Sequence, residues 1–415
     1  MRFVKKIVVL VALYLSACSP SKKINSRSFE IDYDYHQINP QFAVWHFSND
    51  STRVYVKNEA DNDFMIEYKY FNDVAGKVQI DSSVFIGKRQ EDKIQITSSN
   101  NKAIHQLKRN IFFFHLASSM GKKNLLEIKI TDLKSGKNRT SFIYIDKTSS
   151  FSRQNFIAMD VDEKIPLFNN QVSNERFSVR HYDVKYSGQK ISVKYFPLLS
   201  EPAPPSFFDQ KIKPFDFNSD SAFSVSQDDT IQISREGIYH FQMGDGKDGF
   251  TLFHFQEDYP QVTTPDKLAE SLRYLNKNEE YERMKNSKDK KLFIDTFWLQ
   301  RGGDKERAKI LIKEYYNRIQ YANQNFTSYK DGWQTDRGLI YVIYGKPDMV
   351  YRYPNSEHWT YNKTSTEAAV TFYFVKVGNT FSDNHFYLMR NIAYEDSWNI
   401  ATHKWRHGRI NEITK

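Results

Sequence analysis

The residues best suited to chemistry gather late in the chain, between positions 333 and 359. They are two indoles, two carboxylates, a guanidinium and an imidazole, namely Trp333, Trp359, Asp336, Glu357, Arg337 and His358. Such groups occur in clefts that bind or cleave glycans, where aromatic rings stack on sugars and paired carboxylates transfer protons. The pattern is unspecific, because pairs of acids arise by chance in a chain with 50 carboxylates. We therefore assign no catalytic residue and keep Glu357, His358 and Trp359 as candidate ligand-binding residues.

Cys18 is the only cysteine, and its position indicates a lipid attachment site. It follows Leu15-Ser16-Ala17 at the end of a basic and then apolar segment that is too short to span a bilayer as a helix. Leu-Ser-Ala-Cys resembles the lipobox of bacterial lipoproteins, in which the cysteine is acylated and the preceding peptide is removed. A buried structural cysteine is the alternative, but the flanking residues argue against it. We expect residues 1–17 to be a signal peptide and residues 18–28 a tether.

Lipidation implies a membrane as a partner. Each buried acyl methylene contributes about 0.8 kcal/mol, so two or three chains hold a protein on a membrane essentially permanently. Lipoproteins that the Bacteroidota export to the cell surface tend to carry acidic residues after the cysteine, whereas this tether carries Lys22 and Lys23. Ser19 also differs from the aspartate that often retains lipoproteins at the inner membrane. The resemblance thus implies the outer membrane, with the protein facing the periplasm.

Other chemistries have less support. Cys18 is committed to the anchor, and the sequence contains neither a glycine-rich phosphate loop nor a Gly-x-Ser-x-Gly nucleophile turn. His403 and His407 could share a helix face as metal ligands, but no acidic partner follows them. Asp245 and Asp248 lie in a glycine-rich loop with too few carboxylates for calcium. We therefore expect no metal and no cofactor.

The composition indicates a folded protein of mainly β structure. The chain has 415 residues, of which 40% are hydrophobic, with 32 Phe and 26 Tyr. This length allows several domains, and aromatic residues favour pleated, half-buried surfaces. The formal net charge of +9 is spread along the chain without a basic block that interleaves with aromatics, so we expect no nucleic-acid partner.

Alternating apolar and polar residues predict tandem β-sandwich domains of the Ig-like kind. The first covers residues 29–147 and shows its clearest period of two at Leu126–Ile130. The second covers residues 148–258 and contains a similar strand at Ile191–Tyr195. Prolines between Glu201 and Pro205 interrupt strand pairing there, because proline has no backbone donor.

Helical signals follow over residues 259–330. Thr264-Pro265 is typical of a helix start, and a second helix is predicted from Lys290 to the glycines at 302 and 303. A third begins after Asp304 and repeats apolar residues at three- and four-residue steps. These apolar stripes predict a packed core more than a groove for a partner.

The segment after the third helix is the most distinctive part of the sequence. It reads Asp331-Gly332-Trp333-Gln334-Thr335-Asp336-Arg337-Gly338, continues as a tyrosine-rich apolar run to Tyr344, and ends in Gly345-Lys346-Pro347-Asp348. These residues closely resemble the GWxTD-domain family, and the similarity extends over roughly Thr263–Trp405. Family members are typically envelope lipoproteins of Bacteroidota. The resemblance implies a small C-terminal α+β domain, with a β-rich part over residues 331–415, and leaves its chemistry open.

The residue types also suggest what the motif does physically. Gly332 would adopt a backbone conformation closed to other residues and turn Trp333 into the core. Thr335 and Asp336 suit the start of a short helical turn, and Arg337 could pair with a carboxylate. The run Leu339–Tyr344 would then form one buried strand before the turn at Gly345. This account makes the motif a folding element, and a binding site is the alternative.

Two classes of function follow from these observations. The first is a membrane-anchored, noncatalytic binding or scaffold component at the outer membrane that docks on an envelope protein. The second is a protein that binds or processes a cell-envelope glycan through its C-terminal domain. We favour the first, because the chain lacks a specific catalytic signature.

Overall fold

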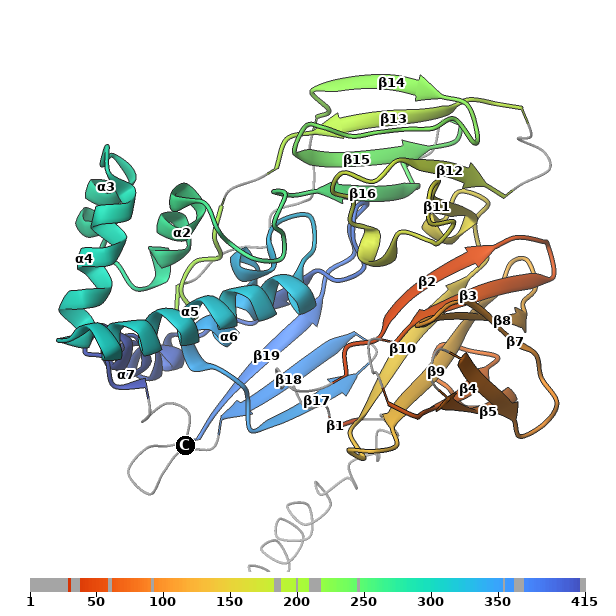
Figure 1. The fold of residues 1–415 in the computed structure, drawn as a ribbon, viewed down its shortest axis with the longest axis horizontal. Helices are drawn as coiled ribbons and strands as arrows, with labels where there is room; N and C mark the ends of the chain where they lie inside the picture. Colours follow the sequence, from red (N-terminus) through yellow and green to blue (C-terminus); the bar gives the residue numbers. More distant parts are fainter. Residues whose placement is uncertain are drawn as a thin grey trace, which may run out of the picture.

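The fold was obtained as a computed structural model that describes most of the chain. The described residues are 29–30, 38–58, 62–90, 93–182, 188–198, 201–208, 218–244, 247–353, 355–361 and 369–410. Cys18, the expected signal peptide, the tether and Asp245 lie outside them. The described part is mostly β and forms three packed parts, with the helices gathered in the C-terminal one (Figure 1). None of the described helices is both long and apolar enough to cross a membrane.

The N-terminal part is a sandwich of two antiparallel sheets. One sheet has the order β2 (Gln41–His46), β3 (Ser51–Lys57), β8 (Ile111–Ala117) and β7 (Ile104–Lys108). The other has the order β10 (Asn138–Asp146), β9 (Lys123–Asp132), β4 (Phe64–Phe71), β5 (Gln79–Gln90) and β6 (Lys93–Ser98). The inward residues of both sheets form one core, which includes Val54, Phe64, Phe114 and Ile128. The predicted alternation is confirmed, since the buried positions recur at every second residue of β4.

The second part is also built from antiparallel strands. Its larger sheet has the order β14 (Ser221–Val225), β13 (Ile191–Phe196), β15 (Gly237–Gln242) and β16 (Phe250–His254), and β11 (Phe156–Asp160) pairs with β12 (Phe177–His181). All residues of β15 and β16 are buried. One side of this hairpin joins the core of the second part, while Ile238 and Phe253 on the other side belong to an apolar cluster with Phe381 of the C-terminal part. Such two-sided burial explains why these strands do not alternate in polarity.

Four helices lead into the C-terminal part, and they are α2 (Pro265–Ser271), α3 (Asn278–Lys285), α4 (Lys290–Gly302) and α5 (Lys305–Phe326). The predicted starts are confirmed, because the side chains of Thr264 and Asp304 accept backbone hydrogen bonds at the first turns of α2 and α5. Gly303 ends α4 with a φ of 78°. Helix α3 was not predicted, since Met284 is its only buried residue and it has no apolar stripe.

The C-terminal part places helices against one face of a sheet. The sheet contains β17 (Met349–Tyr353), β18 (Ser356–Tyr361), β19 (Val370–Lys376) and β20 (Phe386–Leu388), and α6 (Asp336–Tyr344) and α7 (Glu395–Arg406) complete the domain. The predicted strand over Leu339–Tyr344 is wrong, because these residues form α6. All nine residues of α6 are buried, so its sequence has no polar face, and a short apolar run of this kind fits a buried helix as well as a strand.

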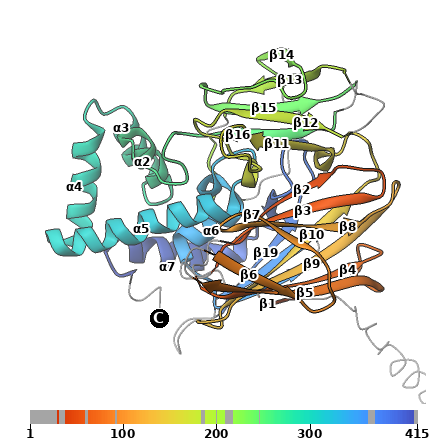
Figure 2. The same ribbon diagram turned by 45° about the vertical axis from the view of Figure 1, so that its right-hand side comes forward.

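Two distant segments complete the C-terminal part. Strand β1 (Phe29–Glu30), at the start of the described chain, pairs with β17 and forms an edge of the C-terminal sheet. The proline-rich segment after Glu201 also lies here, since the Ala203 amide donates to the carbonyl of Gln334 at 2.9 Å. The turned view shows the N-terminal sandwich beside the C-terminal sheet (Figure 2). The three parts are therefore joined by strand pairing and hydrogen bonds as well as by the chain segments that link them.

Candidate functional site

The glycines of the motif allow two backbones to approach closely. A Cβ atom at Gly332 would lie 2.0 Å from the carbonyl oxygen of Ala322 in α5, and one at Gly338 would lie 1.9 Å from the oxygen of Gly332. Gly332 does not have a positive φ. The expected reason for this glycine is therefore corrected: the position lacks space for a side chain, and no unusual backbone conformation is required.

Trp333 and Thr335 connect the 3₁₀ turn Gly332–Gln334 to the helices. The Trp333 side chain is 1% exposed, and its backbone amide donates to the buried Asn323 of α5 at 3.1 Å. The Thr335 hydroxyl accepts from the Gly338 amide at 3.1 Å and donates to the Gly332 carbonyl at 2.7 Å. Thr335 is thus the N-cap of α6, as its residue type predicts.

Asp336 lies in a buried ion pair. Its carboxylate accepts from Arg390 Nη2 at 2.5 Å, from Arg390 Nη1 at 3.0 Å and from the Leu388 amide at 2.7 Å. The Arg390 guanidinium also donates to the carbonyl of Pro204 at 3.1 Å, which ties the proline-rich segment to the motif. Charge-assisted bonds of this type are strong and directional. Asp336 therefore links α6, β20 and the segment around Pro204.

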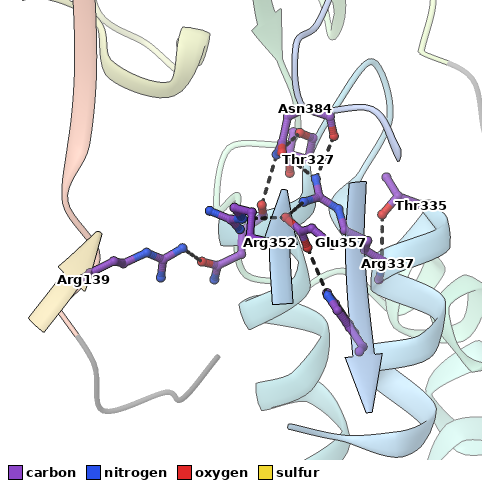
Figure 3. Close-up of polar contacts among 10 residues, drawn as sticks. Arg139, Thr327, Thr335, Arg337, Arg352, Glu357 and Asn384 are labelled. Carbon is purple, nitrogen blue, oxygen red and sulfur yellow. Dashed lines mark hydrogen bonds and ion pairs between the residues drawn. The ribbon is translucent and has the colours of Figure 1, made fainter. Parts of the chain in front are cut away.

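Arg337 and Glu357 form a second buried pair, drawn in Figure 3. Arg337 Nη1 lies 3.2 Å from Glu357 Oε1, and both side chains are at most 2% exposed. Arg337 Nη2 donates to the Asn384 side-chain oxygen at 2.5 Å and to its carbonyl at 2.8 Å. Arg352 Nε donates to the same Glu357 oxygen at 2.8 Å. The predicted contact between Arg337 and a carboxylate is thus present, and two guanidiniums share one acid.

The candidate ligand-binding residues point to opposite faces of β18. Glu357 and Trp359 face the helices, and the Trp359 indole donates to Glu357 Oε2 at 3.0 Å. His358 lies on the outer face, where its ring contacts Tyr353 and Tyr373 at 4.8 Å. Trp333 and Trp359 are almost fully buried, so neither indole offers a face for a sugar. The six residues that suggested a glycan cleft do not line one common site.

The rest of the motif forms a turn. Tyr344 ends α6, Gly345 follows with a φ of 82°, and the segment through Pro347 and Asp348 leads directly into β17. The guanidinium of Arg318 lies against Gly345 and donates to the carbonyls of Val342 and Ile343 at 3.3 Å. A buried cation at a helix C-terminus satisfies carbonyls that have no helical partner.

A large cavity lies where the C-terminal sheet meets the N-terminal sandwich. Its volume is about 1050 Å³. The C-terminal wall includes Arg337, Arg352, Glu357, Lys376 and Phe386, and the opposite wall comes from β9, β10 and the segment after them, including Lys123, Tyr144 and Arg153. Volumes of this size are typical of sites for small organic ligands. Of the motif residues, Arg337 reaches this cavity, so it connects the folding motif to the candidate site.

Contacts across the junction surround this cavity. Arg153 Nη1 lies 3.2 Å from Asp383 Oδ2, and Arg153 Nη2 donates to the Asn379 carbonyl at 3.3 Å. Arg139 of β10 donates to the Asn325 side chain of α5 at 3.4 Å (Figure 3). A second cavity of about 450 Å³ lies beyond this junction and shares Arg153, Lys376 and Asp383 with the first. The site is thus formed by residues from distant parts of the chain.

An acid with a raised pKa lies elsewhere. Burial raises the pKa of Asp331, the residue before the motif, to about 6. Asp331 does not line the large cavity.

The two histidines that could act as metal ligands lie at the end of α7. The rings of His403 and His407 stack there, with centroids 3.9 Å apart. Among the described residues, no three His, Cys, Asp or Glu side chains are arranged to hold a metal ion.

The sequence did not indicate several residues of the site. Asn384, Arg390, Lys376 and Tyr144 stand outside any motif, and their roles depend on tertiary contacts. The pairing of Arg352 with Glu357 could have been predicted from the sequence, because the two residues directly oppose each other in the β17–β18 hairpin. An opposite charge pair across two adjacent strands would have been visible once the hairpin was aligned.

These features define a class of protein: a multidomain, mainly β chain with a C-terminal α+β domain held together by a buried motif helix and two buried ion pairs. The family model described as the GWxTD domain matches residues 237–407, and the chain therefore belongs to the GWxTD domain-containing proteins. The match begins at β15, earlier than the resemblance noted at Thr263, in keeping with the contacts of that hairpin to Phe381. Comparisons with curated proteins and with solved structures gave no match.

Proposed function

We propose that this protein is a membrane-anchored, noncatalytic binding protein of a bacterial cell envelope, and that its ligand occupies the interdomain cavity. One observation carries the proposal: the Arg337–Glu357 pair forms part of the wall of a cavity of about 1050 Å³, and Glu357 already accepts hydrogen bonds from Arg337, Arg352 and Trp359. A general acid or base must exchange a proton with a bound substrate. A carboxylate held by two guanidiniums and an indole is suited to structure and poorly suited to that exchange.

Asp336 supports the same conclusion. Its two oxygens are occupied by Arg390 and the Leu388 amide, and it does not line the cavity. A glycosidase requires two carboxyl groups that flank one bond of the substrate. The two motif acids instead form separate ion pairs, so noncatalytic binding fits this geometry better than glycan cleavage.

The anchor part of the proposal rests on the sequence around Cys18. The basic start, the short apolar run and Leu-Ser-Ala-Cys support acylation, and the lysines of the tether support the periplasmic face of the outer membrane. Mass spectrometry of the mature N-terminus should find an acylated Cys18 with residues 1–17 removed. Cys18→Ser should release the protein from membranes. An unacylated N-terminus in native material would contradict this part.

Ligand binding is tested by identifying the small molecules that copurify with the protein. The full chain is purified from envelopes in mild detergent, and small molecules are extracted and identified by mass spectrometry. Gly378 lines the cavity, and a Cβ there would meet no atom within 4 Å, so Gly378→Trp should fill part of the cavity without displacing the backbone. Lys288→Trp, at an exposed site away from the cavity, is the matched control.

We expect one compound to accompany the wild type and Lys288→Trp and to be lost from Gly378→Trp. Equal retention of a compound or of a protein partner by both variants would place binding outside the cavity. Release of soluble sugars from envelope glycans by the wild type would contradict the noncatalytic assignment.

A further inference from the structure

The charges on the cavity wall are not balanced. Lys123 pairs with Asp146 at 2.8 Å and Arg153 pairs with Asp383 at 3.2 Å, so these two pairs are neutral. Arg337 and Arg352 share the single carboxylate of Glu357. Asp248 also lines the cavity, so among the described lining residues five cations face four carboxylates.

Lys376 accounts for that excess. It is the last residue of β19, it lines both cavities, and it makes no ion pair within the described part of the chain. Its ammonium lies 5.6 Å from the centroid of the Tyr144 ring, and the Lys123 ammonium lies 5.3 Å from the same centroid. The backbone amide of Lys376 donates to the Asn355 carbonyl at 2.8 Å, which fixes the chain at this position.

The environment of Lys376 disfavours its own charge. Burial is the main cause that lowers the pKa of this ammonium below its usual range; Asp383 raises the pKa, and Arg153 and Arg337 lower it. A half-buried cation that makes no ion pair destabilises the folded protein, and such groups concentrate at functional sites. An anion bound in the cavity would remove this unfavourable interaction.

The cavity is too large for a lone inorganic anion. Around the cations its lining includes the aromatic rings of Tyr144, Tyr353 and Phe386 and the amide side chain of Asn379. Aromatic faces and amides suit the body of an organic molecule. The ligand should therefore combine an anionic group with a ring or chain that fills the remaining volume.

We propose that the cavity ligand is an organic oxyanion whose carboxylate or phosphate group binds Lys376, with Arg352 as a further donor on the same cavity wall, an inference that rests on the proposed function. The Arg337–Glu357 pair positions Arg352, because Glu357 accepts from Arg352 Nε and thereby orients that guanidinium. Lys376 supplies the unpaired charge. Arg352 adds a planar donor group that matches both oxyanions.

The test uses three sugars that share one ring. Glucose 6-phosphate carries a phosphate, glucuronate carries a carboxylate, and glucose carries neither. Binding to the full chain in detergent micelles is measured by titration calorimetry and by the shift in the thermal unfolding midpoint. We expect at least one anionic sugar to bind about tenfold or more tightly than glucose, and the stronger of the two identifies the oxyanion.

The variants assign the effect to Lys376. Lys376→Gln should weaken binding of the anionic sugar about tenfold, leave glucose unchanged and keep the unfolding midpoint of the free protein the same or higher. Lys313→Gln removes the same charge from an exposed position on α5 that does not line the cavity, and it should bind like the wild type.

The outcomes separate this inference from the proposed function. If neither anionic sugar binds better than glucose, or if both glutamine variants weaken binding equally, the oxyanion inference is overturned. Recovery of an uncharged compound from the wild type, with loss in Gly378→Trp, would also overturn it while leaving the proposed binding function in place.

Discussion

Glu357 lies at the centre of the buried polar cluster, because its carboxylate accepts from the guanidiniums of Arg337 and Arg352 and from the Trp359 indole. Bringing these charges out of water is costly, and the cost is offset only while the partners remain together. Arg337 is further held by Asn384 and lies over the Phe386 ring at 4.0 Å. Removing Glu357 therefore takes away the buried carboxylate that both guanidiniums contact.

Glu357→Gln should lower the free energy of unfolding by about 3–5 kcal/mol, because it removes the buried carboxylate that Arg337 and Arg352 both contact. Urea denaturation measures this loss. The matched control is Glu306→Gln, which breaks an exposed contact with Lys309 and should cost less than about 1 kcal/mol. A loss for Glu357→Gln no larger than that of the control would show that the cluster does not stabilise the domain.

Helix α6 owes its position to close contact between backbones. The motif turn lies directly on α5 because Gly332 has no side chain, and Thr335 then starts α6 in a fixed direction. At the other end, Arg318 donates to the last carbonyls of α6. The helix is thus held at both ends by residues of the motif and of α5.

Gly332→Ala should displace the motif turn from α5, since its Cβ would lie 2.0 Å from the Ala322 oxygen. We expect a loss of about 3 kcal/mol in unfolding free energy, the upper range for overpacking. Gly378→Ala, at an open position, serves as the control and should change stability by less than about 0.5 kcal/mol. Equal stability of the two variants would refute the close-approach explanation.

The second and C-terminal parts of the molecule pack through an apolar cluster, and polar contacts such as Arg139 to Asn325 join the N-terminal part to the C-terminal one. Phe196, Ile238, Phe253 and Phe255 of the second part surround Phe381 of the C-terminal part. Arg153 adds polar contacts nearby and also lines the cavity. The geometry of the cavity therefore depends on how the parts dock.

Phe381→Ala should loosen this docking, because it removes a side chain that is 3% exposed and contacts the Phe196 ring at 4.8 Å. We expect a loss of about 3 kcal/mol in unfolding free energy and faster hydrogen exchange in β15 and β16. Phe223→Ala is the control, since Phe223 is 43% exposed on β14. Unchanged exchange in β15 and β16 would show that the cluster does not hold the parts together.

Local patterns predicted much of the architecture. The alternation in β4, the caps at Thr264 and Asp304 and the glycine stop at Gly303 depend on neighbours within a few residues, so the sequence was sufficient for them. Helix α6 was mistaken for a strand because burial on every side removes the periodicity on which such predictions depend. Acylation of Cys18 stays a prediction from the sequence, as that residue lies outside the described part.

By itself the sequence determined the family, the mainly β architecture and the presence of a motif that joins a tryptophan, an acid and an arginine. Only the tertiary structure decided which partners these groups take. Arg337 meets Asn384 across 47 residues, Asp336 meets Arg390 across 54, and the cavity brings β10 to β19. Such pairings depend on the packing of distant segments, and no pattern within a few residues of either partner encodes them.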